Sequence, residues 1–451
     1  MTRELRGTGE GMAEANHPAD KVRALQRVLY VAAKRNGQRR FHALYDRIAR
    51  PDVLGRAWEQ VRRNKGAAGI DGETLEAVVA YGVERMLTEL RELLRSGRYR
   101  PQAVRRVFIP KPGRPREQRP LGIPAVRDRV LQTAAKLVLE PIFEASFLPC
   151  SYGFRPKRTA HQALECIRKE ANAGARWVVE VDFKDFFGSL EPDLLLGLVA
   201  RRVSDRRVLR LIRMWVKAGV VEDGVRVSSA TGVPQGGTIS PLLSNIYGHA
   251  LDALWEKEAS HLGKLVRYAD DAVILCRTER EAQHAYDWLR KRVPGLRLQL
   301  HPDKTRVVGL EEGAEGFDFL GFHLRMVRSR KYGRWYCQRW PSRRAMAAVR
   351  AKIKAITAPR SRLLWPLDRL VEELNPVLRG WGNYFGRGNS AKKFTQIDSY
   401  VQERLALFDS KKRGKAGRGW GSRHNWAWYR RLGVYRLPGR VRYDPTATAA
   451  R

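Results

Sequence analysis

The stretch 265–276, LVRYADDAVILC, consists of two runs of strand-forming residues that meet at Asp270 and Asp271. Both flanks carry apolar and β-branched residues of the kind that fill buried strands, whereas Asp is depleted from strands. Two adjacent carboxylates repel each other, and burial disfavours the charged form of each. The stretch therefore predicts a pair of strands joined at the two aspartates, and some further group must offset the cost of placing them there.

Three explanations for this pair are open. Asp is a common turn residue, so the pair can be an exposed turn. Two carboxylates can also share a proton as a general acid/base dyad. Alternatively they hold a divalent metal ion, because Mg²⁺ binds through one or two carboxylates together with substrate phosphates. Asp182, at the end of the apolar run 177–181 (WVVEV), supplies a third carboxylate. Three such groups can hold a metal pair that stabilises both oxygens of a phosphoryl transfer.

The charge of the chain points to a polyanionic partner. Its 451 residues include 86 Lys and Arg against 47 acidic residues, a net charge of +39 spread along the chain. This excess favours nucleic acid, and anionic membrane second, over a solvated basic surface. At 43% apolar and 9% aromatic, the sequence can fill a large core.

The remaining composition argues against several classes of protein. The four cysteines are far apart and form no CxxC pair, as expected for reduced thiols rather than a zinc site. No apolar run approaches the roughly 18 residues of a membrane span. We therefore expect a cytoplasmic, nucleoid-associated protein that does not contact a membrane.

Apolar spacing and turn residues predict the order of elements. We expect helices before residue 100, a strand, basic loop and strand over 103–124, a buried helix over 126–147 and a helix starting near Pro192. Ser240 is expected to cap a helix that has Pro241 at its first position. Beyond residue 340 the sequence predicts three helices, with Asn375 capping a new start at a break in the middle one.

Several blocks of sequence occur in a characteristic order. They are GAAGIDG (66–72), IPKPG and RPLGIP (109–124), SYGFRPKRTAHQAL (151–164), VVEVDFKDFFGSL (178–190), GVPQGGTISPLLSNI (232–246), VRYADDAVILC (266–276), LHPDKT (300–305), FDFLGFHL (317–324) and LNPVLRGWGNYF (374–385). Together they resemble the group II intron-encoded reverse transcriptase/maturase family. The resemblance covers residues 60 to 410.

This resemblance implies an α+β fold, namely a right-hand polymerase with fingers and an antiparallel palm sheet followed by a helical thumb, or maturase (X) domain. The expected divisions are a disordered tail over 1–20, fingers and palm over 21–340, the thumb over 341–410 and a basic, aromatic nucleic-acid-binding segment over 411–451. The sequence shows no Cys-bearing HNH endonuclease after the thumb. We therefore expect priming from another source, such as a nascent strand at a replication fork.

The resemblance also assigns candidate roles to residues. Asp182, Asp270 and Asp271 are expected to be catalytic and to bind two Mg²⁺ ions, with Mn²⁺ as an alternative. Residues expected to bind the incoming dNTP are Lys111, Arg119, Phe187 and Gln235, where Phe187 would exclude a 2′-hydroxyl. Residues expected to hold the primer end are Phe319, Leu320 and Gly321. Residues expected to contact nucleic acid are Arg155, Lys304, Trp420, Trp426 and Trp428.

Each assignment has a simpler alternative. The basic loop that carries Lys111 and Arg119 can be a solvated surface, and Phe187 can be a core residue. Trp381 and Tyr384, at helical spacing, are predicted to pack in the core rather than against nucleic acid. The tail that includes Tyr429 is expected to stack on bases instead, because its aromatic residues lie among Arg and Gly.

The expected function is that of an RNA-directed DNA polymerase that also helps its intron RNA to splice and to move. Its expected partners are group II intron RNA, a DNA target or primer, and dNTPs, and it acts as a monomer or a dimer. Two other functions remain open. One is a non-enzymatic splicing maturase, and the other is a host-domesticated reverse transcriptase used in defence or repair.

Overall fold

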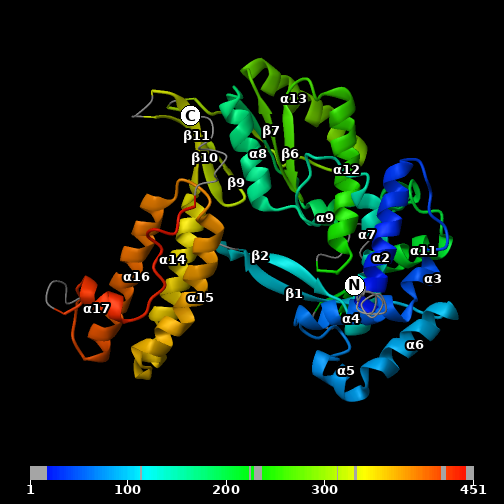
Figure 1. Ribbon diagram of the computed structural model, residues 1–451, viewed down its shortest axis with the longest axis horizontal. Coiled ribbons are helices and arrows are strands. Elements are labelled where there is room, and N and C mark those ends of the chain that lie inside the picture. The colour runs from blue at the N-terminus through cyan, green and yellow to red at the C-terminus, as the bar shows by residue number, and fades with distance from the viewer. Residues whose placement is uncertain are drawn as a thin grey trace, which may run out of the picture.

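The computed structural model describes residues 18–111, 114–222, 225–227, 236–311, 313–329, 333–417 and 423–442 (Figure 1). At its centre is a four-stranded sheet in which every neighbouring pair of strands is antiparallel. In spatial order its strands are β6 (Lys264–Tyr268), β7 (Asp271–Cys276), β3 (Trp177–Val181) and β8 (Arg306–Gly309). The two halves of the opening stretch are therefore neighbouring strands, as predicted.

The central sheet separates two hydrophobic cores. On one face Val179 and Ile274 pack with residues of α13 (Glu279–Arg292). On the other face Val178 and Val273 pack with residues of α8 (Ala160–Asn172). Because successive side chains of a strand point to opposite faces, a strand covered on both sides reads as a continuous apolar run. This is why β7 has no alternation of polar and apolar residues.

The N-terminal half adds helices and a second sheet around α7 (Val126–Glu144), which is buried along most of its length. The helices are α2 (Pro18–Arg35), α3 (Tyr45–Ile48), α4 (Pro51–Arg63), α5 (Leu75–Tyr81), α6 (Val83–Arg95), α9 (Phe186–Ser189), α10 (Pro192–Ala200), α11 (Arg206–Val216) and α12 (Ser240–Glu258). The second sheet has the order β2 (Arg114–Ile123), β1 (Val104–Lys111), β4 (Val220–Glu222), β5 (Val225–Val227). The predicted strand, basic loop and strand is the β1–β2 hairpin, which extends towards the C-terminal helices (Figure 1).

The C-terminal part begins with a three-stranded antiparallel sheet and continues with helices. The strands are β9 (Phe317–Phe319), β10 (Phe322–Arg328) and β11 (Trp335–Pro341), and the helices are α14 (Arg343–Thr357), α15 (Leu367–Phe385), α16 (Ala391–Lys412) and α17 (Trp426–Arg431). Short 3₁₀ turns, η1 (Val293–Leu296) and η2 (Arg360–Leu364), complete the elements. The α+β class with an antiparallel central sheet is confirmed, and so are the three C-terminal helices, whereas in the second sheet β1 pairs with β4 in parallel.

Ser240 does not cap its helix as predicted. The residue before the first turn of α12 is Ile239, and its backbone is already helical (φ −89°, ψ −19°). An N-cap needs extended backbone so that its side chain can reach the free N–H groups. Ser240 lies one position too late for this role, although Pro241 does stand in the first turn.

The predicted break at Asn375 is also wrong, because α15 is continuous and contains Pro376. Pro376 is exposed, so water can reach the carbonyl that its missing N–H leaves without a partner. The Asn375 side chain instead holds the C-terminal segment: its Nδ2 donates to Gly433 O (3.1 Å) and its Oδ1 accepts from Tyr435 N (2.6 Å). The Asn375 side chain, which the sequence suggested as a helix cap, thus binds the backbone of the C-terminal segment instead.

The structure tests two expectations about the whole chain only over the residues that it describes. Within the described ranges, no helix is long and apolar enough to cross a membrane. Residues 1–17 lie outside those ranges, so the predicted disordered tail stays a prediction, and α2 begins at Pro18 close to the predicted start.

Candidate active site

The strand register of the central sheet brings the candidate carboxylates together. Val181 on β3 pairs with Ala272 on β7. Asp182 follows Val181 and Asp271 precedes Ala272, so in an antiparallel pair the two aspartates fall next to each other. Asp270 stands in the turn between β6 and β7, one residue further along. Three carboxylates from two distant blocks of sequence therefore gather at one end of the sheet.

The turn that carries Asp270 is conformationally demanding. Tyr268 pairs with Asp271, so the turn between the two strands contains only Ala269 and Asp270. Ala269 adopts the left-handed conformation, with φ of 59°. Such a conformation costs a non-glycine residue of the order of 1–3 kcal/mol and persists only where the surroundings enforce it. The tight turn fixes where both aspartates point.

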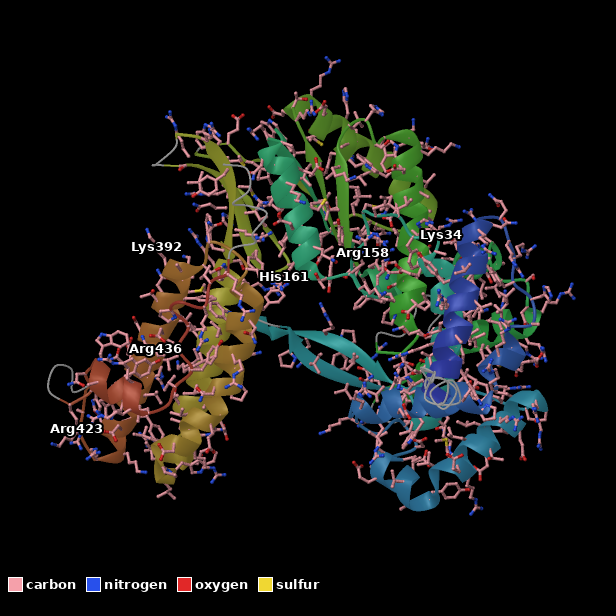
Figure 2. The ribbon with its side chains drawn as sticks, viewed as in Figure 1. Lys34, Arg158, His161, Lys392, Arg423 and Arg436 are labelled. Atoms are coloured by element: carbon pink, nitrogen blue, oxygen red, sulfur yellow. The ribbon has the colours of Figure 1, made fainter. Side chains whose placement is uncertain are left out.

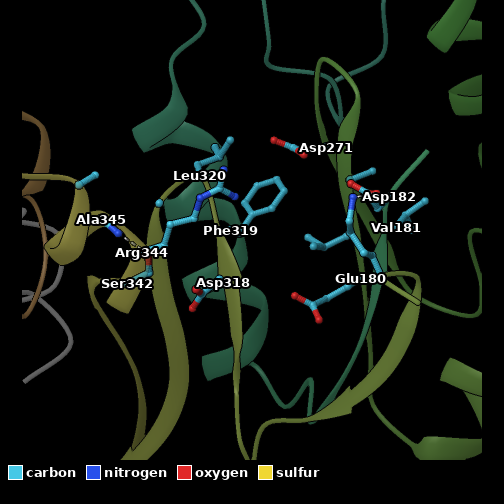
Figure 3. Close-up of a pocket in the computed structure, with 15 residues that line it drawn as sticks. Glu180, Val181, Asp182, Asp271, Asp318, Phe319, Leu320, Ser342, Arg344 and Ala345 are labelled. Atoms are coloured by element: carbon cyan, nitrogen blue, oxygen red, sulfur yellow. Dashed lines mark hydrogen bonds and ion pairs between the residues drawn. The ribbon is translucent and has the colours of Figure 1, made fainter. Parts of the chain in front are cut away.

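A cavity of about 410 Å³ opens at this end of the sheet. Figure 3 shows Asp182 and Asp271 on one side and Leu320 and Arg344 on the other, with the ring of Phe319 between them. The second side is formed by the β9–β10 turn and the start of α14. Carboxylates thus face the turn that the sequence assigned to the primer end, across a space open to solvent.

Burial and mutual repulsion make ionisation of the aspartates at this site unfavourable. Burial raises the pKa of Asp271 to about 7, and the nearby charges of Asp270 and Asp182 add to the rise. Its side chain remains reachable by solvent through the cavity, while protein surrounds it on the other sides. Burial also raises the pKa of Asp270, and the cation of Arg119 acts in the opposite direction. A site of this kind gains from a bound cation.

Lys304 supplies one such positive charge, because its Nζ lies 2.9 Å from Asp182 Oδ2. The loop before β8 wraps the backbone of Asp182: His301 N donates to Asp182 O (2.8 Å), and Thr305 Oγ1 donates to the same oxygen (3.1 Å). The block LHPDKT is therefore packed against the end of β3. Whether Lys304 also contacts nucleic acid stays a prediction.

The donor set fits a hard divalent cation when substrate supplies the remaining ligands. No group of three His, Cys, Asp or Glu side chains within the described ranges is arranged to hold a metal by itself. Asp182 and Asp271 line the cavity, and Asp270 lies beside it. Mg²⁺ is usually bound by one or two carboxylates together with phosphates and water, so two inward carboxylates are sufficient protein ligands.

The structure places only some of the candidate dNTP residues. Arg119 lies on β2, and its positive charge opposes the rise in the pKa of Asp270 and of Asp271, so the hairpin brings a cation near the turn. Phe187 is half-buried on α9 with its ring edge-on to Phe186, at a centroid distance of 5.9 Å. The side chain of Lys111 and all of Gln235 lie outside what the structure describes.

The candidate primer turn is connected to the C-terminal helices. Leu320 (φ 49°) and Gly321 (φ 79°) form the turn between β9 and β10. The Tyr384 hydroxyl on α15 donates to Leu320 O (2.9 Å). His161, which is labelled in Figure 2, stands at the start of α8. Its Nε2 atom lies 2.7 Å from Tyr384 O. Tyr384 therefore links α8, the β9–β10 turn and α15, and it packs against the core as predicted.

Tyr384→Phe tests this link. The change removes one partly buried hydrogen bond and should lower the free energy of unfolding by about 1 kcal/mol. We expect primer–template to dissociate faster, while the rate of single-nucleotide addition at saturating substrate changes little. Filter binding and single-turnover kinetics measure the two quantities. Tyr400→Phe on α16 is the matched control, and equal effects of both changes would contradict the link.

Arg155 is held inside the protein. It makes a bidentate ion pair with Glu144, with Nη2 to Oε1 at 2.7 Å, and donates to Leu148 O and Ser151 O. Its side chain is 4% exposed. A guanidinium with these partners orders the loop that carries it. Contact with nucleic acid at this position stays a prediction, and it would have to involve the loop rather than the free side chain.

Among the described residues of the aromatic tail, one side chain expected to stack on bases is buried in the fold. Tyr429 is fully buried, contrary to prediction, because α17 packs against α16 and places its hydroxyl near Asp398. Trp428 is half-buried beside His424. Trp426 is 45% exposed, with the guanidinium of Arg436 4.9 Å from its ring. Trp420 lies outside the described residues.

Two arginines of the site were missed at the level of sequence. Arg344 lines the cavity, and its positive charge opposes the rise in the pKa of Asp271. It stands in the first turn of α14, where a positive charge interacts unfavourably with the helix dipole. A cation at such a position indicates a role other than stabilising the helix. Arg267 lies completely buried beneath the aspartate turn. An arginine inside an apolar strand carries a similar signal, since such a charge needs specific partners.

Comparisons with known proteins show which families the chain resembles. Residues 109–324 match the family model of the reverse transcriptase (RNA-dependent DNA polymerase), and residues 346–426 match the group II intron maturase-specific domain. Protein YkfC of Escherichia coli (strain K12) is 34% identical over 351 residues, which cover 69% of this chain and 90% of YkfC.

Two further relatives match over shorter regions. Group II intron-encoded protein LtrA of Lactococcus lactis subsp. cremoris is 39% identical over 214 residues, 47% of this chain and 35% of LtrA. Nuclear intron maturase 1, mitochondrial, of Arabidopsis thaliana is 35% identical over 94 residues, 21% of this chain and 13% of that protein. With a reverse transcriptase domain followed by a maturase domain, the chain is an RNA-directed DNA polymerase and belongs to the group II intron-encoded reverse transcriptase/maturase family.

Proposed function

We propose that Asp182, Asp270 and Asp271 are the catalytic carboxylates of this polymerase and hold two Mg²⁺ ions, with Mn²⁺ as a substitute. The observation that carries the proposal is the register of β3 and β7, which sets Asp182 beside Asp271 at the cavity facing the β9–β10 turn. Bound divalent ions would supply charge stabilisation for the attacking and leaving oxygens of phosphoryl transfer.

In the proposed mechanism the protein side chains position the substrates. The turn at Phe319, Leu320 and Gly321 holds the primer end over the cavity, so that its 3′-hydroxyl faces the carboxylates. Holding reactants in this way removes a large entropic part of the barrier. Lys304 compensates the charge of Asp182 before substrate binds, and its ammonium group would be within reach of a phosphate oxygen of the bound substrate.

The incoming nucleotide would bind between the β1–β2 hairpin and the aspartate turn. Arg119, together with Lys111 in the same hairpin, is proposed to hold the triphosphate, because cations aimed at developing charge stabilise its transfer. Phe187 is proposed to lie under the sugar and Gln235 beside the base. In this arrangement the second sheet forms the fingers, the central sheet the palm, and α14, α15 and α16 the thumb of a right hand.

The maturase domain is proposed to hold group II intron RNA while the RNA splices, and to hold the template duplex during copying. The net charge of +39 supports a long contact with phosphates. DNA target and primer are the other proposed partners. The exposed Trp426, with Arg436 stacked on it, is proposed to contact bases in the C-terminal segment.

Extension of a DNA primer on an RNA template by the purified chain tests this function. Extension should require a divalent ion, stop on chelation and resume when Mg²⁺ is added. Phe187→Ala should then incorporate ribonucleotides that the wild type rejects. Tight binding of intron RNA without any extension would instead make the chain a splicing cofactor alone.

A further inference from the structure

Arg267, three residues before Asp270, lies under the aspartate turn, and every N–H group of its guanidinium donates a hydrogen bond. The side chain is 1% exposed, and the carboxylate of Asp252 on α12 that faces it is 0% exposed. Nε donates to Asp252 Oδ1 (2.7 Å) and Nη2 to Oδ2 (2.6 Å). This bidentate geometry fixes the plane of the guanidinium.

The remaining donors reach other segments of the chain. Nη2 also donates to Ser151 Oγ (2.9 Å), and Nη1 donates to Asn245 Oδ1 (3.3 Å) and to Ala269 O (2.9 Å). A guanidinium has five N–H donors, and all five have acceptors here. A loop, the helix α12 and the aspartate turn therefore converge on one buried cation.

The bond to Ala269 O is the contact that reaches the aspartate turn. A peptide unit is planar, so the orientation of the Ala269 carbonyl also sets the N–H of Asp270 on the same plane. Ala269 has the left-handed backbone that costs energy. The bond from Arg267 holds that peptide in place from below, where water cannot compete for the carbonyl.

Two glycines leave room for this arrangement. A Cβ at Gly153 would collide with the backbone nitrogen of Ala269, and one at Gly248 on α12 would lie 2.7 Å from Nη1 of Arg267. Asn245 Nδ2 donates to Gly153 O (2.8 Å), so the loop with Gly153 is tied to the same cluster. The blocks SYGF and SPLLSNI thus contribute backbone and side chains that support the turn.

Stability alone does not require a cation at this position. A buried ion pair is often no more stabilising than apolar residues of the same volume, because both charges lose their hydration. What an apolar residue cannot do is donate to Ser151, Asn245 and Ala269 at the same time. The arrangement is therefore suited to fixing a geometry.

We propose that Arg267 is a positioning residue of the polymerase, which holds the Ala269–Asp270 peptide so that Asp270 and Asp271 are presented to the metal ions and substrate. This inference rests on the proposed function of the two aspartates. It predicts that loss of the guanidinium fork slows chemistry in a protein that still folds and binds RNA.

Arg267→Lys tests the proposal, because Lys keeps the charge opposite Asp252 but cannot span all of the acceptors. A displacement of about 1 Å at a reacting group can cost about 10²-fold, so we expect kcat for single-nucleotide addition to fall about 10²-fold. The KM for dNTP should change little, and the Mg²⁺ concentration for half-maximal rate should rise. Arg202→Lys is the matched control: Arg202 is buried and donates to Ser146 Oγ and Ala33 O, away from the turn.

The outcomes separate the hypotheses. A wild-type kcat and Mg²⁺ dependence in folded Arg267→Lys would overturn the proposal, as would equal losses in Arg202→Lys. If Arg267→Lys does not fold, Gly248→Ala decides, because its methyl group displaces the guanidinium while Ala favours the helix. It should lower kcat in a protein that still folds, and an unchanged kcat would overturn the proposal. An inactive wild type would instead reject the proposed function.

Discussion

Asp182→Asn and Asp271→Asn are each expected to reduce the rate of single-nucleotide addition by at least about 10⁴-fold. The two side chains line the cavity, and the strand register places them next to each other. Asn has nearly the same shape but no negative charge, so it weakens metal binding without opening a cavity. Losing several kcal/mol of charge stabilisation corresponds to this factor, at 1.36 kcal/mol for each tenfold change.

Asp318→Asn is the matched control for these variants. Asp318 lines the same cavity from β9, but its carboxylate is bound to His323 Nδ1 (2.8 Å). We expect activity within about tenfold of the wild type, because Asp318 lies on the primer side of the cavity, across from Asp182 and Asp271 (Figure 3). Single-turnover kinetics, with RNA binding measured in parallel, decide the matter. An active Asp271→Asn, or an equally inactive Asp318→Asn, would contradict the assignment.

The Mg²⁺ requirement should depend steeply on pH below neutrality. Burial raises the pKa of Asp271 from an ordinary 3.8 to about 7. Without a bound metal ion, the fold therefore favours the neutral carboxyl of Asp271. The stability that comes from keeping this carboxyl protonated is lost as the pH rises through about 7. A metal ion binds the deprotonated form, so protons compete with it below that pH.

We expect the half-saturating Mg²⁺ concentration to rise by up to about tenfold for each pH unit below 7, and to level off above about pH 8. Initial rates measured at several Mg²⁺ concentrations, from about pH 5.5 to about pH 8.5, give the half-saturating Mg²⁺ concentration directly. Rates at saturating Mg²⁺ provide the control, since they should vary less. A half-saturating concentration that is independent of pH would show that Asp271 is ionised throughout.

Local sequence was sufficient to predict the strands and the identity of the candidate carboxylates. The pattern around Asp270 and Asp271 predicts two strands and a turn because both flanks are apolar and the two aspartates interrupt them. The basic hairpin between Val104 and Ile123 was predictable because an alternating run breaks at a loop rich in Pro, Gly and Arg. What local sequence could not supply is the pairing register of β3 and β7, which is set by packing between distant segments.

The errors arise where tertiary contacts use a residue that local rules assign elsewhere. Asn375 before Pro376 has the pattern of a helix start, yet its amide binds the backbone of the C-terminal segment and the helix continues. Tyr429 lies among arginines in the sequence, yet the fold buries it beside Asp398. Arg267 was overlooked because Ser151 and the α12 residues Asn245 and Asp252 meet it only in the folded chain.

Primer extension on an RNA template with dNTPs and Mg²⁺, comparing the wild type with Asp270→Ala, tests the central claim most directly. The account predicts that the wild type extends the primer and that the variant, while folded and bound to intron RNA with wild-type affinity, does not. Extension by the variant at the wild-type rate would mean that the paired aspartates form only a structural turn, and the proposed active site would be wrong.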